Sequence, residues 1–117
     1  MSVDAMFPLA RFRVEERSMS PDLEPGDYVI VNRWAYRRRD PAVGELVVFR
    51  DPQRAGRYLC KRIADVRGDG MYTVRGDNEA ISRDSRSFGP VPRGAIVGKV
   101  WRAERGRRGA VGPESPF

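Results

Sequence analysis

Two residues of this chain stand out as a possible nucleophile and its base, Ser18 and Lys61. The chain contains 20 arginines, two lysines and no histidine. The lack of histidine excludes Ser-His-Asp and Cys-His mechanisms, so any nucleophile needs another base. Arginine stays protonated in proteins, whereas a buried lysine can lose its proton and act as a base. The surroundings of the two lysines, Lys61 and Lys99, therefore matter most.

The alternating pattern around Lys61 predicts that its amine is partly buried. Lys61 lies between Leu59 and Ile63 on one face of an expected strand, because alternate strand residues share a face. If this face points inward, desolvation lowers the amine pKa, by up to about 3–5 units at full burial. A neutral amine could then take a proton from the Ser18 hydroxyl. The alternative for any strand lysine is an amine that extends into solvent, which we expect for Lys99.

Length and composition limit the class of protein. With 117 residues, 40% of them hydrophobic, and a net charge of +6, the chain is expected to form one globular domain. A single cysteine excludes an internal disulfide and, without histidine, the usual structural zinc site. No apolar run approaches the roughly 18–20 residues that span a bilayer. We expect a soluble, cytoplasmic protein whose chemistry needs no metal or organic cofactor.

Short apolar segments separated by Pro-Gly and Asp-Gly turns predict an all-β domain, either a small barrel or a folded sheet. The domain is expected over residues 11–101, between a flexible lead-in at 1–10 and a disordered basic tail at 102–117. No convincing amphipathic helix is present. The expected strands cover residues 12–14, 28–32, 46–49, 58–63, 71–74 and 95–101.

Four sequence boxes occur in the order of a known family. Ser-Met-Ser-Pro at residues 18–21 is followed by Gly-Asp at 26–27, and Pro-x-x-Gly-Glu with a hydrophobic strand covers 41–49. Lys61-Arg62 comes next, and the last box is Gly-Asp-Asn at 76–78 with Ser-x-Asp-Ser-Arg at 82–86. In these boxes the chain resembles the bacterial type I signal peptidases, serine proteases that use a Ser/Lys pair.

The resemblance implies a role for each matched residue. Ser18 would attack the scissile carbonyl and Lys61 would take its proton, while the backbone N–H of Ser18 would contribute to an oxyanion hole. Ser82 would hydrogen-bond the Lys61 amine and fix its direction. Asp84 and Arg86 would form a supporting ion pair. Three residues would shape the loop beside the site: Gly76, Asp77 and Asn78.

Three positions depart from the family pattern. Glu16 lies two residues before Ser18, where family members often have a serine or glycine that helps the oxyanion hole. A carboxylate donates no hydrogen bond unless it is protonated, so the second oxyanion donor stays open. Asp22 replaces a common threonine, and Glu45 replaces the usual aspartate.

Family members normally carry a membrane anchor before the serine box, and we expect none in this protein. The subgroup that the chain resembles best is the small, soluble nickel-type superoxide dismutase maturation proteases, which trim a leader from their substrate. The implied partner is therefore a precursor protein whose N-terminal leader binds in extended form, with small side chains next to the cut.

Other functions stay open at this stage. The arginine run at 37–39 with Trp34 and Tyr36 could bind nucleic acid, although such runs more commonly form a solvated face. A relative of the self-cleaving SOS-response repressors would share the Ser/Lys chemistry, but the chain has no room for their DNA-binding domain. Peripheral membrane docking is a further possibility, through the two aromatics and three residues near the N-terminus, Met6, Phe7 and Leu9.

Overall fold

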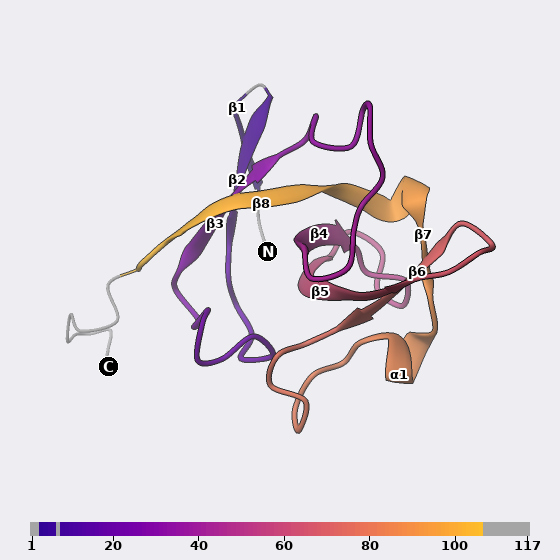
Figure 1. The fold of residues 1–117 in the computed structure, drawn as a ribbon. Helices are drawn as coiled ribbons and strands as arrows, with labels where there is room; N and C mark the ends of the chain where they lie inside the picture. Colours follow the sequence, from indigo (N-terminus) through magenta and orange to yellow (C-terminus); the bar gives the residue numbers. More distant parts are fainter. Residues whose placement is uncertain (1–2, 7, 107–117) are drawn as a thin grey trace.

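One curled antiparallel sheet makes up most of the computed structural model, which describes residues 3–6 and 8–106 (Figure 1). Its eight strands follow the order β1-β2-β3-β8-β4-β5-β6-β7. Helical structure in this part of the chain consists of one α-helical turn, α1 (Ser85–Phe88), and one 3-10 turn at Arg93–Ala95. The strands are β1 (Val3–Met6), β2 (Leu9–Arg13), β3 (Tyr28–Asn32), β4 (Leu46–Arg50), β5 (Tyr58–Val66), β6 (Met71–Arg75), β7 (Val91–Pro92) and β8 (Ile96–Glu104). The expected all-β folded sheet is confirmed.

Strand β8 joins the two halves of the sheet. It pairs with β3 on one side and with β4 on the other, so that Lys99 lies opposite both Asn32 and Val47. In Figure 1 it is the long orange-yellow strand that runs from the β7 region across to β3. Strands close in sequence form the two halves, and the last strand of the chain connects them.

Two hydrophobic clusters form the core, and β4 and β5 contribute to both. Val48 and Cys60 belong to the first cluster, whereas Val47, Phe49 and Leu59 belong to the second. Strands buried on both faces appear in sequence as nearly continuous apolar runs, as Leu-Val-Val-Phe does in β4. The other buried members of the first cluster are Ala10, Phe12, Val14, Met19, Leu23, Val29 and Val31, and those of the second are Ile63, Tyr72, Val74 and Val91.

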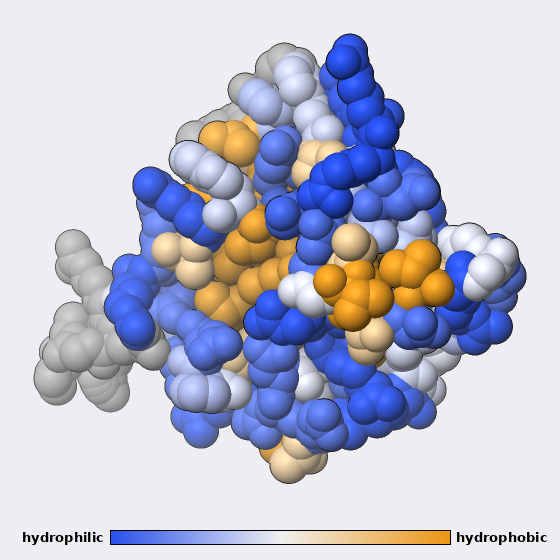
Figure 2. All heavy atoms as spheres, in the orientation of Figure 1, coloured by the Kyte–Doolittle hydropathy of each residue, from blue (hydrophilic) through white to orange (hydrophobic). Residues whose placement is uncertain are grey.

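The surface carries most of the polar residues. Figure 2 shows a largely hydrophilic face on which apolar residues gather in a central hollow and in an adjoining patch. A charged fraction of 32% accounts for the hydrophilic rim. Apolar exposure is therefore concentrated in a small part of this face.

The structure places residues 3–6 and 9–10 of the expected flexible lead-in in strands. β1 and β2 form an antiparallel hairpin in which Met6 lies opposite Leu9. Ala10 is fully buried and pairs with Val31 of β3. β2 also pairs with β3, about twenty residues further along the chain, so the short apolar pattern of residues 9–11 did not reveal a strand.

The expected boundary at residue 101 is also corrected. β8 continues to Glu104, because residues 102–104 pair with Tyr28–Ile30 of β3 through the register Tyr28 opposite Glu104. The remainder of the expected disordered tail, 107–117, lies outside the described residues.

A glycine in β8 gives a direct test of this packing. A Cβ atom at residue 98 would lie 2.4 Å from the Asn32 carbonyl oxygen. We expect Gly98→Ala to lower the free energy of unfolding by about 1–3 kcal/mol, because β3 and β8 would have to separate. Gly94→Ala is the control, since its Cβ meets nothing within 4 Å. Urea unfolding followed by circular dichroism measures both, and equal effects would contradict the close β3–β8 approach.

Candidate active site

Ser18 lies in the segment between β2 and β3, which is held together at its two ends and packed against the core. At the ends of the segment, the Val14 N–H donates to the Asp27 carbonyl oxygen at 2.8 Å. Met19 and Leu23 are buried in the first core cluster. The serine hydroxyl is therefore presented by a loop that is packed against the sheet.

Lys61 of β5 points to that serine. Its side chain is fully buried, as are Leu59 and Ile63 on the same face, so the sequence-based expectation of an inward face is confirmed. Lys61 Nζ and Ser18 Oγ lie 2.5 Å apart, although the two residues are separated by 43 positions in the chain. Ser18 itself is 6% exposed.

Burial lowers the pKa of the Lys61 amine below its ordinary value of 10.5. The nearby negative charges of Glu16 and Asp84 act in the opposite direction, but they do not cancel the desolvation. A lysine with a lowered pKa has a larger neutral fraction at a given pH, and the neutral amine can accept a hydroxyl proton. The pair thus has the geometry and the electrostatics of a nucleophile with its base.

The loop at 76–78 packs directly on the Ser18 backbone. The Asn78 N–H donates to the Ser18 carbonyl oxygen at 2.8 Å. A Cβ at position 76 would lie 2.0 Å from Ser82 Oγ and 2.8 Å from the Ser18 carbonyl oxygen, so only glycine fits there. This segment sets the position of Ser18 through backbone contacts.

Asp84 is the central hydrogen-bond acceptor of the adjoining loop, which covers residues 76–86. Its buried carboxylate accepts hydrogen bonds from the Gly76 N–H at 2.9 Å, from the Ser82 hydroxyl at 3.0 Å and from Arg86 Nε at 3.0 Å. Burial alone would raise the pKa of Asp84, but the Arg86 guanidinium and the other donors hold it well below its usual range. The expected Asp84–Arg86 ion pair is therefore formed. Through Asp84, residues Gly76 and Ser82 are connected to the start of α1.

The expected contact between Ser82 and the Lys61 amine is not formed. The Ser82 hydroxyl donates to Asp84 Oδ2 instead. The physical reason is that a buried ionised carboxylate is the stronger acceptor, and that Ser82 is only two residues away from it. Ser82 therefore contacts Gly76 and Asp84, and through them supports the loop beside Ser18.

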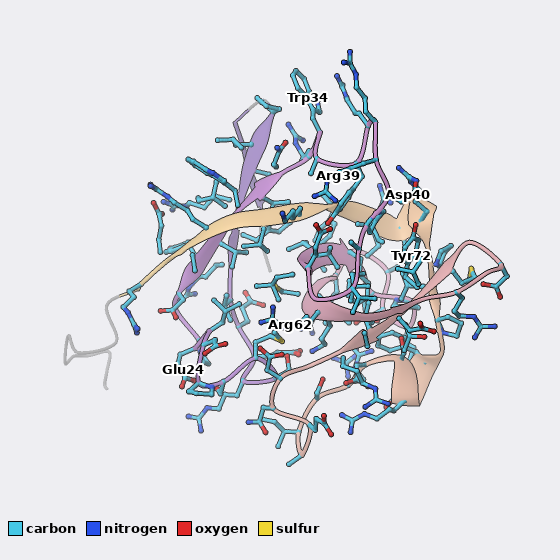
Figure 3. All side chains as sticks on the ribbon, viewed as in Figure 1. Glu24, Trp34, Arg39, Asp40, Arg62 and Tyr72 are labelled. Atoms are coloured by element: carbon cyan, nitrogen blue, oxygen red, sulfur yellow. The ribbon has the colours of Figure 1, made fainter. Side chains whose placement is uncertain are left out.

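Two arginines at the site were not assigned a role from the sequence. Arg62, next to the lysine, pairs with Asp77 through two hydrogen bonds of 2.8 and 3.1 Å, which ties β5 to the 76–78 loop. Figure 3 shows Arg62 between the two halves of the sheet. Arg83 forms an ion pair with the fully buried carboxylate of Asp51 at the end of β4. An alternation of charges in sequence could have suggested such pairs without saying which residues form them.

An apolar cleft opens beside the Ser18–Lys61 pair. It encloses about 350 Å³ when its open mouth is included. One wall is the segment after β2 and the other is the start of β5. The residues that line it are Val14, Glu15, Glu16, Ser18, Met19, Leu23, Arg57, Tyr58, Leu59, Cys60 and Lys61.

Comparison with known proteins agrees with this arrangement. Residues 2–71 and 68–102 match the family described as signal peptidase, peptidase S26. The chain belongs to this family. The Ser18 and Lys61 boxes and the 76–86 loop all lie within the matched part.

Relatives in the S26 family include subunits of mitochondrial inner membrane proteases. The chain is 36% identical to the ATP-independent subunit 1b of Arabidopsis thaliana, over 73% of this chain and 64% of the relative. It is 30% identical to subunit 2 of Danio rerio, over 82% and 66% respectively. It is 35% identical to subunit 1 of Schizosaccharomyces pombe, over 71% and 65%. The chain thus spans slightly less than two thirds of the length of these relatives.

Glu45, which replaces the usual aspartate of the S26 box, anchors a polar cluster away from the serine. It accepts hydrogen bonds from the Tyr36 hydroxyl at 2.7 Å, from Arg39 at 2.8 Å and from the Ala42 N–H at 3.0 Å. Burial alone would raise the pKa of Glu45, but these donors lower it to about 2. The longer side chain thus stays ionised and ties the loop before β4 to the arginine run.

The described residues give little support to a metal site, a reactive cysteine or a membrane-spanning helix. Within residues 3–6 and 8–106, no group of three or more His, Cys, Asp or Glu side chains could hold a metal ion. Cys60 lines the cleft, but burial raises the pKa of its thiol to about 12, which keeps it protonated. No helix in this part of the chain is long and apolar enough to cross a membrane.

The buried lysine predicts a specific dependence of stability on pH. Because the folded protein releases the Lys61 proton at lower pH than the unfolded chain, its stability rises with pH up to about 10.5. Lys61→Met, which removes the charge and keeps an unbranched side chain, should be more stable than the parent at pH 7. The difference in free energy of unfolding between the variant and the parent, called here the margin, should shrink as the pH approaches 10.5. Urea unfolding at several pH values measures it.

Lys99→Met is the matched control for this experiment. The Lys99 side chain is 39% exposed, and its amine lies 3.5 Å from Glu45 Oε2 at the surface. The Lys61→Met result is therefore compared with that of a lysine that is not buried. A Lys61→Met margin that stays constant from pH 7 to 10.5 would contradict the desolvation of Lys61.

Proposed function

We propose that this protein is a serine endopeptidase of the S26 family that removes an N-terminal leader from a precursor protein with a Ser18–Lys61 dyad. The observation that carries the proposal is the buried contact of 2.5 Å between Lys61 Nζ and Ser18 Oγ. Histidine is absent from the chain, so the lysine is the base within reach of the serine. The family match and the boxes around both residues support the same reaction.

In the acylation step, Ser18 Oγ attacks the carbonyl carbon of the scissile peptide bond while the neutral Lys61 amine takes the hydroxyl proton. The resulting tetrahedral intermediate carries its negative charge on the former carbonyl oxygen. The C–N bond then breaks, and Lys61 gives its proton to the leaving amine. The leader remains attached to Ser18 as an ester.

In the deacylation step, a water molecule attacks the ester carbonyl and gives a proton to Lys61. The ester C–O bond breaks, and the proton returns to Ser18 Oγ, so that the dyad is restored and the leader leaves as a carboxylic acid. The same amine serves both steps, because burial lowers its pKa below the ordinary value of 10.5 and so enlarges the neutral fraction that can accept a proton. The two steps use Ser18, Lys61, the substrate and water, without a cofactor.

The lining of the cleft supports a particular class of substrate. Its apolar lining, with Val14, Met19, Leu23 and Leu59, suits small uncharged side chains next to the cut. The start of β5 and the segment after β2 form its two walls, so an extended leader can lie between them. The matched relatives support leader removal in general, and the nickel-type superoxide dismutase precursor is the narrower candidate that the sequence resemblance suggested.

Incubation with purified precursors would test the narrower candidate. If this protein is a dedicated maturation protease, it should cleave a nickel-type superoxide dismutase precursor at one site before the metal-binding N-terminus. Comparable cleavage of unrelated leaders would assign a general leader peptidase instead.

Substitutions in the dyad test the reaction itself. Ser18→Ala and Lys61→Met should each abolish cleavage of an internally quenched leader peptide while circular dichroism shows an intact fold. Lys61→Arg should be equally inactive, because the charge remains but the basicity does not. Lys99→Met should retain the parent rate. Measurable turnover by Lys61→Arg would refute the role of the lysine as base.

Ser82→Ala should have a milder effect than the dyad variants. Its hydroxyl acts on Asp84 and lies outside direct contact with Lys61, so its loss leaves the proton acceptor in place. The expected change is a drop in kcat of about tenfold or less. A loss as complete as that of Ser18→Ala would instead assign Ser82 to the reacting centre.

Peripheral membrane contact is the second part of the proposal. Trp101 on β8 is 60% exposed, and it lines a surface groove with Arg39 and Lys99. Figure 3 shows Trp34 and Arg39 on the segment that projects beyond β8. Exposed tryptophan with cationic neighbours suits an anionic lipid surface. Of the docking set expected from the sequence, Phe7 lies outside the described residues. Tyr36 is excluded, because its hydroxyl is bound to Glu45 and its ring packs against the second core cluster.

Vesicle flotation tests the membrane contact. The protein should float with vesicles that contain anionic lipid and not with neutral ones, and Trp101→Ala should reduce the floated fraction several-fold. Val43→Ala, at a 62% exposed residue outside this groove, is the control. Steeply salt-dependent binding to DNA by the Ser18→Ala variant, without flotation, would favour the nucleic-acid alternative.

A further inference from the structure

An ion pair joins the two walls of the cleft beside the dyad. Arg57, just before β5, donates from Nη2 to Oε2 of Glu16 at 3.1 Å. Both side chains line the cleft that also contains Ser18 and Lys61. They are partly exposed, at 36% and 42%, so they stand at its mouth and not in the core.

The proposed reaction places a negative charge in this region. The tetrahedral intermediate needs hydrogen-bond donors at its oxyanion, and such donors commonly come in pairs. One donor is available, because no described residue accepts a hydrogen bond from the Ser18 backbone N–H. Glu16, two residues before the nucleophile, carries an ionised carboxylate that cannot donate and that would repel the oxyanion.

Arg57 has the donors that Glu16 lacks. A guanidinium carries five N–H donors, and among the described residues that of Arg57 uses one of them, for Glu16. The remaining donors belong to a permanently charged group whose position is set by the ion pair. A charged donor is also stronger than a neutral one toward an anionic oxygen.

We propose that the Arg57 guanidinium, held by Glu16, is the second oxyanion donor of this protein. This inference rests on the proposed function, since it assigns a residue to the same reaction. Arg57 neutralises the Glu16 carboxylate and at the same time donates to the oxyanion opposite the Ser18 N–H. The residue is thus a catalytic residue that contacts the reacting oxygen, and its partner Glu16 is a positioning residue.

The first test replaces the donor. Arg57→Met should lower kcat for an internally quenched peptide with alanine before the cut by about 10²–10³-fold, with little change in KM. A peptide aldehyde that forms a tetrahedral adduct with Ser18 should lose affinity by a similar factor. Arg54→Met is the matched control, because Arg54 is an exposed arginine of the same loop that does not line the cleft. It should stay within twofold of the parent.

Two double variants separate donation from simple charge neutralisation. Glu16→Ser with Arg57→Met supplies a hydroxyl donor in place of the guanidinium, and it should recover kcat to within about tenfold of the parent. Glu16→Ala with Arg57→Met removes the repulsive carboxylate without supplying a donor, and it should stay as slow as Arg57→Met. Full recovery in the alanine variant would overturn the inference, because Arg57 would then only neutralise Glu16.

The parent and the single variant keep this test distinct from that of the dyad. Cleavage that depends on Ser18 but is unchanged in Arg57→Met would overturn the role of Arg57 and leave the proposed function standing. Absence of any Ser18-dependent cleavage or aldehyde adduct in the parent would contradict the proposed function itself. Circular dichroism of each variant establishes that the partly exposed substitutions leave the fold intact.

Discussion

The desolvated amine of Lys61 is the constraint on which the arrangement of this protein depends. Lowering the pKa of a lysine requires the exclusion of water, and the buried neighbours Leu59 and Ile63 on the same strand face provide that. The negative charge of Asp84 nearby opposes this effect. The pairing of Asp84 with Arg86 limits this opposition, so the structure can keep an ionised carboxylate close to the Lys61 amine.

Ion pairs hold the loops around this amine to the sheet. Arg62 ties β5 to Asp77, and Arg83 ties the loop of Ser82 to the buried Asp51. Arginine suits these positions because its planar group pairs with a carboxylate through two hydrogen bonds and cannot lose its proton. The chain thus assigns permanent charge to arginine for structure, and leaves titratable positive charge at the site to one lysine.

The departures from the family boxes follow the same electrostatic logic. Glu45 in place of aspartate gathers Tyr36 and Arg39 around an ionised group away from the serine. Glu16 near the nucleophile is matched by Arg57 from the opposite wall of the cleft. In both places the carboxylate is paired with an arginine, so neither charge is left uncompensated.

The sequence by itself determined the strand class, the inward face of β5 and the order of the boxes, because a period of two and turn residues are local properties. It also indicated Ser18 and Lys61, since the lack of histidine left few candidates for a base. Only the tertiary structure decided that these residues meet, that Ser82 binds Asp84, that residues 3–6 and 9–13 form a hairpin, and that Glu16 faces Arg57. The Ser18–Lys61 and Glu16–Arg57 contacts join residues 43 and 41 positions apart, and local pattern does not encode which distant segments meet. The hairpin and the Ser82–Asp84 contact are short in sequence, but alternation and turn residues did not distinguish them from other local arrangements.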